Sequence, residues 1–322
     1  MEANFAQILE KIKAYDKIVI HRHQNPDPDA VGSQAGLATA IQAGYPNKQV
    51  KIVGSSVGDL DWLAQPEEVA DDFYQGALVI VVDTANTPRI SDPRFDQGDF
   101  LIKIDHHPNR DAYGDYYHVV PEASSSSELV VDLINDSEGA LVLTQEAARV
   151  LYAGIVGDTG RFMYNSTTTH TFNVAAQLIG TGFNHSVVSE NLYEMTLAQA
   201  RLQSIVFDQI SFDGHGAAHV MISRELIAKL GLRDDQVNSI VSTPGRLKGV
   251  LLWSIYVEKP DGTYRVHFRS KGPIINVIAQ EHGGGGHPLA SGANAQDQAE
   301  VQTIIAEMVA AGSAYQTQPT VN

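Results

Sequence analysis

The 322-residue sequence contains no cysteine, which excludes disulfides, thiolate nucleophiles and cysteine-ligated zinc. Any bound metal must therefore be held by histidine and carboxylate side chains. Long hydrophobic runs are also missing, since the longest aliphatic run, Ala77 to Val82, is far too short to span a bilayer. Residues 1–17 predict a polar amphipathic helix without the apolar stretch of a secretory signal. We therefore expect a cytoplasmic protein that has no membrane partner.

Positive charge is scarce as well. The chain has 22 Lys and Arg against 38 Asp and Glu, for a net charge of −16. Long nucleic acids are bound mainly by neutralising many phosphates with basic side chains, so this composition argues against a long nucleic acid as partner. A small anionic substrate is compatible with it, because bound metal ions add charge that the residue count omits.

The N-terminal half alternates short apolar segments with helical patterns, which predicts an α/β fold with a mostly parallel sheet. Polar residues follow several of these strands, where open α/β sheets place ligands. The predicted strands are Lys17–His21, Gln49–Val53, Ala77–Asp83 and Phe100–Asp105, and the predicted helices are residues 1–14, Ala30–Ala43, Ser126–Asn135, Thr144–Gly157 and Thr169–Ile179.

The pattern changes near residue 204 and predicts a second, smaller α/β domain. We expect domains at 1–184 and 204–322, joined by a helical connector at 185–203, with a frayed end at 313–322. Asp261-Gly262 predicts a hairpin turn. The predicted strands here are Ile205–Phe212, Ala217–Ile222, Gly249–Glu258 and Tyr264–Ser270, and the helices are His185–Arg201, Arg224–Leu230, Ile274–Glu281 and Gln298–Ala310.

The first candidate site lies in His21 to Ser33, directly after an apolar strand. His23, Asp27 and Asp29 fall within seven residues, and imidazole with carboxylate suits a divalent transition metal. Two prolines stiffen the segment, so a solvated surface loop is an equally good interpretation of this segment alone. The amides at the start of the following helix would favour an anionic ligand.

Further ionisable residues follow other strands and one helix. Asp83 alone is typical of a turn or helix cap, and Asp158 alone of a loop after a helix. The triplet Asp105-His106-His107 is more typical of a site, because ionisable groups next to a buried strand need partners. Taken together, these acids and histidines exceed the needs of one metal. They predict two metals about 3.5–4 Å apart that share a carboxylate and support phosphoester hydrolysis.

The motifs His23-Gln-Asn-Pro-Asp27-Pro-Asp29, Asp83, Asp105-His106-His107 and Gly157-Asp158-Thr159-Gly160 resemble motifs I to IV of the DHH phosphoesterase superfamily. Arg269-Ser270-Lys271 and the glycine-rich segment Gly283 to Gly292 resemble its DHHA1 domain. The resemblance spans nearly the whole chain, and the pairing of the two domains is similar to the nanoRNase and pAp-phosphatase branch of the superfamily. It implies a DHH catalytic domain at 1–184 and a DHHA1 domain at 204–322.

The resemblance also implies manganese and a role for each residue of the first domain. His23, Asp27 and Asp83 would hold one ion, and Asp29, Asp83, His106 and Asp158 the other. His107 would donate a hydrogen bond to the phosphate or leaving group, and Asp105 would orient a histidine. His21 precedes the motif and is expected to be a core residue.

The second domain offers cations and glycines as candidate substrate ligands: Arg269, Ser270, Lys271, Gly283, Gly284, Gly285, Gly286 and His287. The four glycines could present successive amides as an anion nest, although such a run alone is more typical of a flexible turn. His282 is a further candidate cation. Arg246 and Lys248 are weaker candidates, equally typical of a solvated loop.

We therefore expect an enzyme that degrades short oligoribonucleotides to mononucleotides and releases phosphate from 3′-phosphoadenosine 5′-phosphate (pAp). Hydrolysis of pApA or cyclic dinucleotides is an alternative. Pyrophosphatase activity and long-chain exonuclease activity are disfavoured by the C-terminal motifs and by the acidic charge, respectively. A catalytically silent nucleotide sensor is a rival of another class, and the intact metal motifs argue against it. The sequence leaves open whether the chain forms a homodimer.

Overall fold

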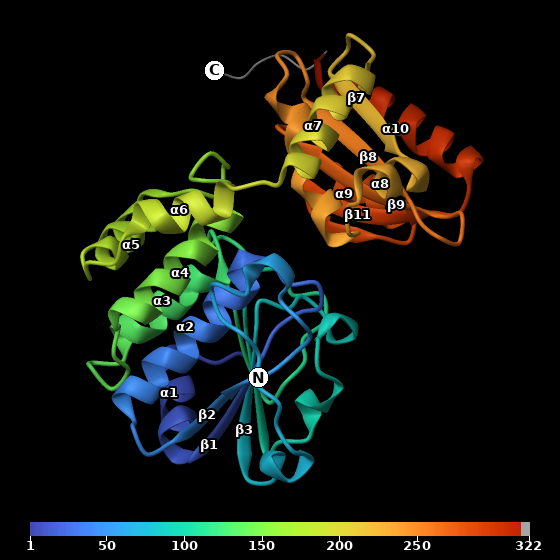
Figure 1. The fold of residues 1–322 in the computed structure, drawn as a ribbon. Coiled ribbons are helices and arrows are strands. Elements are labelled where there is room, and N and C mark those ends of the chain that lie inside the picture. The colour runs from blue at the N-terminus through green and yellow to red at the C-terminus, as the bar shows by residue number, and fades with distance from the viewer. Residues whose placement is uncertain (317–322) are drawn as a thin grey trace. The chain divides into compact units, whose positions relative to one another are not determined.

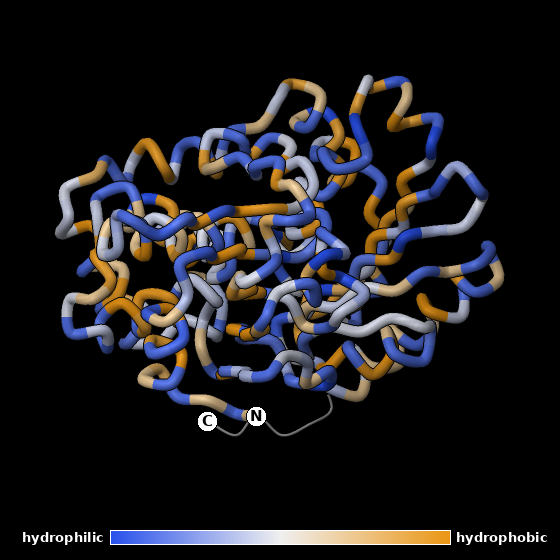
Figure 2. The backbone as a smooth tube through the Cα atoms, turned by 90° about the horizontal axis from the view of Figure 1, so that it is seen from below, coloured by the Kyte–Doolittle hydropathy of each residue, from blue (hydrophilic) through white to orange (hydrophobic). Residues whose placement is uncertain are grey.

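A computed structural model describes residues 1–316 of the chain. These residues form two compact units, and the boundary between them in the sequence lies between Glu194 and Met195. The predicted frayed end at 313–322 is helical as far as Gln316, and its remainder lies outside the described residues. Hydrophobic and hydrophilic stretches alternate along the chain (Figure 2), and no helix among the described residues is long and apolar enough to cross a membrane.

The first unit is built on a five-stranded sheet of order β2-β1-β3-β4-β5, in which all neighbouring strands are parallel. This confirms the predicted fold class. The strands are β1 Lys17–His21, β2 Gln49–Ile52, β3 Ala77–Val82, β4 Phe100–Asp105 and β5 Tyr116–Val119; the helices are α1 Phe5–Ala14, α2 Pro28–Gly44, α3 Ser126–Asp136, α4 Gln145–Asp158, α5 Thr169–Ile179 and α6 His185–Tyr193. The short strand β5 was not predicted.

The two faces of this sheet are covered differently. Helices α1 to α4 pack side by side on one face, against alternate residues such as Ile18, Ile80 and Ile104 (Figure 1). The other face is covered by loops and short 3₁₀ turns, which pack on residues such as Val79 and Val81. Because both faces are buried, β3 is apolar at all six positions, as expected for a central parallel strand. The 3₁₀ turns of this unit are η1 Gly58–Leu60, η2 Asp71–Tyr74, η3 Thr87–Arg89 and η4 Pro93–Asp96, and Leu60 of η1 packs instead against the core on the helical face.

The second unit contains a mixed sheet of order β10-β11-β9-β8-β7-β6, in which only β7 and β8 are parallel. Helices α9 and α10 pack on one face, and α7 and α8 on the other. The elements are α7 Leu197–Gln209, β6 Ser211–Phe212, β7 Ala217–Ile222, α8 Arg224–Leu230, η5 Asp235–Ile240, η6 Thr243–Arg246, β8 Leu252–Glu258, β9 Tyr264–Ser270, α9 Asn276–Glu281, β10 Gly285–His287, β11 Ala290–Ala295 and α10 Gln298–Gln316.

Two predictions around the junction were wrong. The strand expected at Ile205–Phe212 is the end of α7 followed by a two-residue strand. Leu202 and Val206 are four residues apart and both point into the core, which is the spacing of a helix. The short apolar run that had suggested a strand is part of this helical pattern. The continuous connector is also interrupted, because α6 ends at Tyr193 and Thr196 caps a new helix.

Candidate functional site

The carboxyl ends of β1, β3 and β4 and the end of α4 bring the predicted metal residues together. Ligand atoms of His23, Asp27 and Asp83 lie within 4.8 Å of one another. A second group with the same spacing contains Asp29, His106 and Asp158. These residues come together because the strands of a parallel sheet all end at the same edge.

Asp83, a member of the first group, also faces the second group. Its Oδ2 is 3.4 Å from Nε2 of His23, and its Oδ1 is 3.5 Å from Nε2 of His106. The backbone of Asp83 is left-handed, with φ of 49°, a conformation that costs a non-glycine residue free energy. The hydroxyl of Tyr113 donates to the carbonyl of the following residue, Thr84, at 2.8 Å, and this bond helps to hold the conformation of Asp83. One carboxylate oxygen therefore faces each group, as a bridging ligand requires.

The two imidazoles are oriented by main-chain carbonyls. Nδ1 of His23 lies 2.7 Å from the Gln24 carbonyl, and Nδ1 of His106 lies 3.3 Å from the Ala123 carbonyl. A ring nitrogen next to a carbonyl must donate, so Nε2 of each ring is directed at the carboxylates. Nε2 of His106 is also 3.1 Å from Asp158 Oδ2. This is the orientation in which histidines bind metal ions.

Asp29 is fully buried and is held by the start of α3. The amides of Ser126 and Ser127 donate to its two oxygens at 2.7 and 2.9 Å, and the Ser126 hydroxyl donates to Asp83 Oδ1 at 3.1 Å. Each carboxylate oxygen has a second lone pair, so these bonds leave Asp29 able to bind a cation. A helix N-terminus favours the negative charge. The sequence analysis missed these serines, although four consecutive serines at the start of an amphipathic helix are a recognisable signal.

Close packing between α2 and α4 places Asp29 near Asp158. A Cβ on Gly154 would lie 2.0 Å from the Ser127 hydroxyl and 2.8 Å from Asp29 Oδ1, so no larger residue fits there. The expected role of the α2 amides is partly wrong. Asp27 caps this helix, and the Ala30 amide donates to its Oδ1 at 3.0 Å, so that amide already has a partner within the chain.

The pKa shifts show that the cluster needs positive charge. Burial lowers the pKa of His23, but Asp27 and Asp83 outweigh it and raise that pKa to about 10. Burial, together with Asp83 and Asp158, raises the pKa of Asp29 well above its ordinary value. Burial also raises the pKa of Asp158, whereas the neighbouring histidines outweigh burial and lower that of Asp83, so the four clustered carboxylates depend on protons or cations close to them. With two nitrogen donors, they fit two divalent metal ions.

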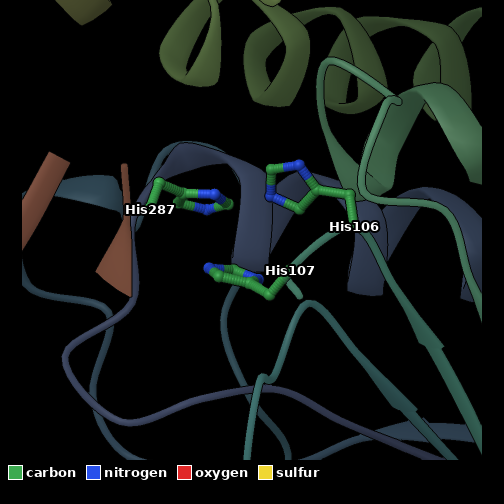
Figure 3. A group of neighbouring side chains, drawn as sticks. All are labelled: His106, His107 and His287. Carbon is green, nitrogen blue, oxygen red and sulfur yellow. The ribbon is translucent and has the colours of Figure 1, made fainter. Parts of the chain in front are cut away.

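His107 lies beside the cluster and is held by Asp105. Asp105 Oδ1 lies 2.8 Å from Nδ1 of His107 and accepts its backbone amide at 3.2 Å. Figure 3 shows the ring of His107 next to that of His106, and the two planes are 69° apart. These contacts agree with the expectation that Asp105 orients a histidine, and the histidine is His107. His21 is a core residue, as expected: its Nε2 meets the Tyr74 hydroxyl at 3.1 Å, and burial lowers its pKa to about 4.

In the second unit, the sheet register places Arg269 and His287 on one face. Both are paired with Ala290, Arg269 from β9 and His287 from β10, and directly paired residues point to the same side. Every second position of β9 holds one of Arg265, His267 and Arg269, so these three side chains lie on this face and form a stripe with an arginine at each end. Burial, together with the two arginines, lowers the pKa of His267 to about 3. The sequence analysis missed this arginine-flanked stripe, although the alternation in β9 indicates it.

The glycine-rich segment differs from the expected nest. The amides of Gly283 and Gly284 donate to the carbonyls of Gln280 and Ala279, which end α9. These two amides are therefore not available for an anion, and that part of the prediction was wrong. Gly285 and Gly286 belong to β10 at the edge of the sheet. His282 is not a substrate candidate either, because Glu300 and Glu307 lie 2.7 and 3.0 Å from its two nitrogens.

Ser270 is the last residue of β9, next to Arg269, and Lys271 follows the strand. The Ser270 hydroxyl accepts the Gly272 amide at 3.1 Å, so it fixes the turn that follows the strand. The side chain of Lys271 is exposed, while its amide donates to the Leu251 carbonyl at 2.7 Å. Both side chains therefore lie at the same end of the strand as Arg269, and their contact with substrate stays a prediction.

Comparisons with known proteins agree with this architecture. Residues 17–155 match the DHH family N-terminal domain, and residues 217–311 match the DHHA1 domain. A solved structure of an exopolyphosphatase-related protein from Bacteroides fragilis has the same fold, with a TM-score of 0.86 at 24% identity over 98% of this chain and 97% of that one.

Two curated relatives are similar over nearly their full length. The probable bifunctional oligoribonuclease and PAP phosphatase NrnA of Streptococcus mutans is 49% identical, covering 94% of this chain and 97% of the relative. The bifunctional oligoribonuclease and PAP phosphatase NrnA of Bacillus subtilis is 43% identical, covering 94% and 96%. Identity at this level spans both units, and the chain therefore belongs to the DHH family of phosphoesterases that carry a C-terminal DHHA1 domain.

Proposed function

We propose that this protein hydrolyses short oligoribonucleotides to mononucleotides and removes phosphate from pAp. The observation that carries the proposal is the Asp83 carboxylate, which has one oxygen toward each of two groups of metal-binding side chains. Relatives of 49% and 43% identity are named for these two activities. Family membership makes the protein a metal-dependent phosphohydrolase.

The residues divide the work. His23, Asp27 and Asp83 would hold one divalent ion, and Asp29, Asp83, His106 and Asp158 the other. When bound, such ions supply a nucleophile at neutral pH and neutralise charge on the phosphoryl oxygens. The nitrogen-rich shell favours manganese over magnesium. His107, fixed by Asp105, would donate a hydrogen bond to the substrate phosphate or the leaving group.

The second unit would supply groups that bind substrate. Arg269 and His287 share one face of its sheet and would bind a phosphate or base of the nucleotide. Ser270, Lys271, Gly285 and Gly286 remain neighbouring candidates. The arginine-flanked stripe supports this assignment, because the rest of the chain is strongly acidic. A homodimer and a cytoplasmic location remain predictions from the sequence.

A substrate panel with metal-loaded protein tests the proposal. We expect phosphate release from pAp and mononucleotides from dinucleotides, with activity abolished by a chelator and restored best by manganese. Hydrolysis restricted to pApA, cyclic dinucleotides or pyrophosphate would assign a different substrate. Full activity after exhaustive dialysis against chelator would refute the two-metal mechanism, and nucleotide binding without turnover would indicate a sensor.

RNA length provides a second test. Each added nucleotide meets an acidic protein that gains little from counterion release, unlike the long basic grooves of general single-strand binders. Activity per RNA end should therefore fall as the substrate lengthens from two to about ten nucleotides. Equal rates per end for a dimer and a long RNA would group the protein with the long-chain exonucleases instead.

A further inference from the structure

Lys103 is a fully buried lysine in the middle of β4, between two isoleucines of the core. Its ammonium donates to the main-chain carbonyls of Ala85 and Asp111, at 3.0 and 3.1 Å, and to the side-chain oxygen of Asn109 at 3.4 Å. The ring of Tyr113 lies 4.6 Å below it. A buried ammonium is costly unless it is paired and hydrogen-bonded, so these contacts fix the charge at one place.

The group that this charge faces is Asp105. Nζ of Lys103 is 3.4 Å from Asp105 Oδ2, and both side chains are completely buried. The other oxygen, Oδ1, is occupied by the amide and ring of His107. No hydrogen bond among residues 1–316 reaches Oδ2, so Lys103 supplies its counter-charge.

This pairing matters because Asp105 lies close to a like charge. Burial and Asp83, the proposed bridging ligand, raise the pKa of Asp105, but His107 and Lys103 outweigh them, so the pKa lies below its ordinary value. Without the ammonium, His107 would be the one side-chain partner among residues 1–316 that holds the orientation of this buried carboxylate. Rotation of Asp105 would then release the His107 ring, whose Nδ1 is also 3.6 Å from Asp83 Oδ1.

We propose that Lys103 is a positioning residue for the hydrolysis proposed above: its ammonium holds Asp105 in the orientation that accepts from His107, and thereby fixes the His107 ring for contact with substrate. The inference rests on the proposed function and assigns Lys103 no contact with substrate or metal.

Lys103→Met tests this inference because it keeps the length of the side chain and removes the charge. Lys48→Met is the matched control. Lys48 is another buried lysine of the first unit, and it donates to the carbonyls of Lys13 and Tyr15 at 2.9 and 2.6 Å. We expect Lys103→Met to lower kcat on pAp about 10- to 100-fold, as for groups that orient site residues, with KM and metal content within about threefold. Lys48→Met should keep wild-type kcat.

A double-mutant cycle with His107→Ala separates positioning from general loosening of the site. If Lys103 acts through His107, adding Lys103→Met to His107→Ala should lower kcat by less than about threefold. An additive loss, or a kcat of Lys103→Met equal to that of Lys48→Met, would overturn the inference. Should Lys103→Met fail to fold, Lys103→Gln enters the same cycle, since it keeps a donor but no charge.

A readout without turnover completes the test. In metal-free protein, the ¹⁵N shift of the His107 Nδ1 at one pH should report a hydrogen-bonded N–H in the wild type and in Lys48→Met, and its loss in Lys103→Met. An unchanged Nδ1 signal in Lys103→Met would contradict the inference. If the wild type were inactive but Lys103→Met still lost the Nδ1 signal, the proposed function would be contradicted and the positioning contact would stand.

Discussion

The two units treat charge in opposite ways. The first buries its ionisable groups at the ends of β1, β3 and β4, where Asp29 and Asp83 are at most 1% exposed. The second carries its cations along β9, where Arg269 is half-buried and Arg265 is exposed. Buried carboxylates without solvent depend on protons or cations, whereas partly exposed arginines keep their charge. The comparison teaches that the first unit suits the metal-dependent chemistry of its family, and it supports the proposal that the second unit recognises an anion.

The sharpest way to break this comparison is Asp83→Ala. Because this carboxylate faces both groups of ligands, its loss should lower kcat by several orders of magnitude. The fold should survive, because removing one of several clustered acids relieves repulsion in metal-free protein. Phosphate release and thermal unfolding are the measurements. His21→Ala is the control, since His21 lies in the core beside Tyr74, and it should cost much less activity. Similar turnover in both variants would refute the ligand assignment.

Arg269→Ala should have an intermediate effect, on affinity. Loss of a charge-assisted contact to a phosphate or base should raise KM for pAp and dinucleotides about tenfold or more, with the metals still bound. Steady-state kinetics and metal analysis check this prediction. Arg224→Ala is the control, because Arg224 forms an ion pair with Asp234 and lies beside Glu258, which pairs with Tyr264 at the opposite end of β9 from Arg269. A normal KM in Arg269→Ala would remove the second unit from substrate binding.

The smallest effect concerns pH and stability in the second unit. Burial lowers the pKa of His282, but Glu300 and Glu307 outweigh it and raise that pKa above the ordinary value. A raised pKa stabilises the folded state fully below the unfolded pKa of about 6.5, and this stabilisation is lost as pH rises through the folded pKa. The stability difference between wild type and His282→Gln should therefore be largest near pH 5–6 and shrink toward pH 9. A constant difference in thermal unfolding across this range would contradict the pairing.

Sequence patterns alone predicted a large part of the fold and of the site. The apolar strands of the first unit were predicted correctly, because a buried parallel strand must be apolar throughout. The acids and histidines that follow them come together as expected, because the ends of parallel strands meet at one edge, and their role as ligands stays a prediction. The helix at Leu197–Gln209 was partly missed, because a short apolar run fits either period until its packing partners are known.

Only the tertiary structure decided which groups hold the others in place. The serine amides that bind Asp29 come from 97 and 98 residues away, and β10 and β11 bring His287 into register with Arg269. The amides of Gly283 and Gly284 are used by the end of α9, which no count of glycines could reveal. The sequence by itself determined which side chains can bind metal and phosphate, because that is a property of each residue type. Their orientation, their protonation and the buried Lys103–Asp105 pair depend on distances between distant segments, which only folding sets.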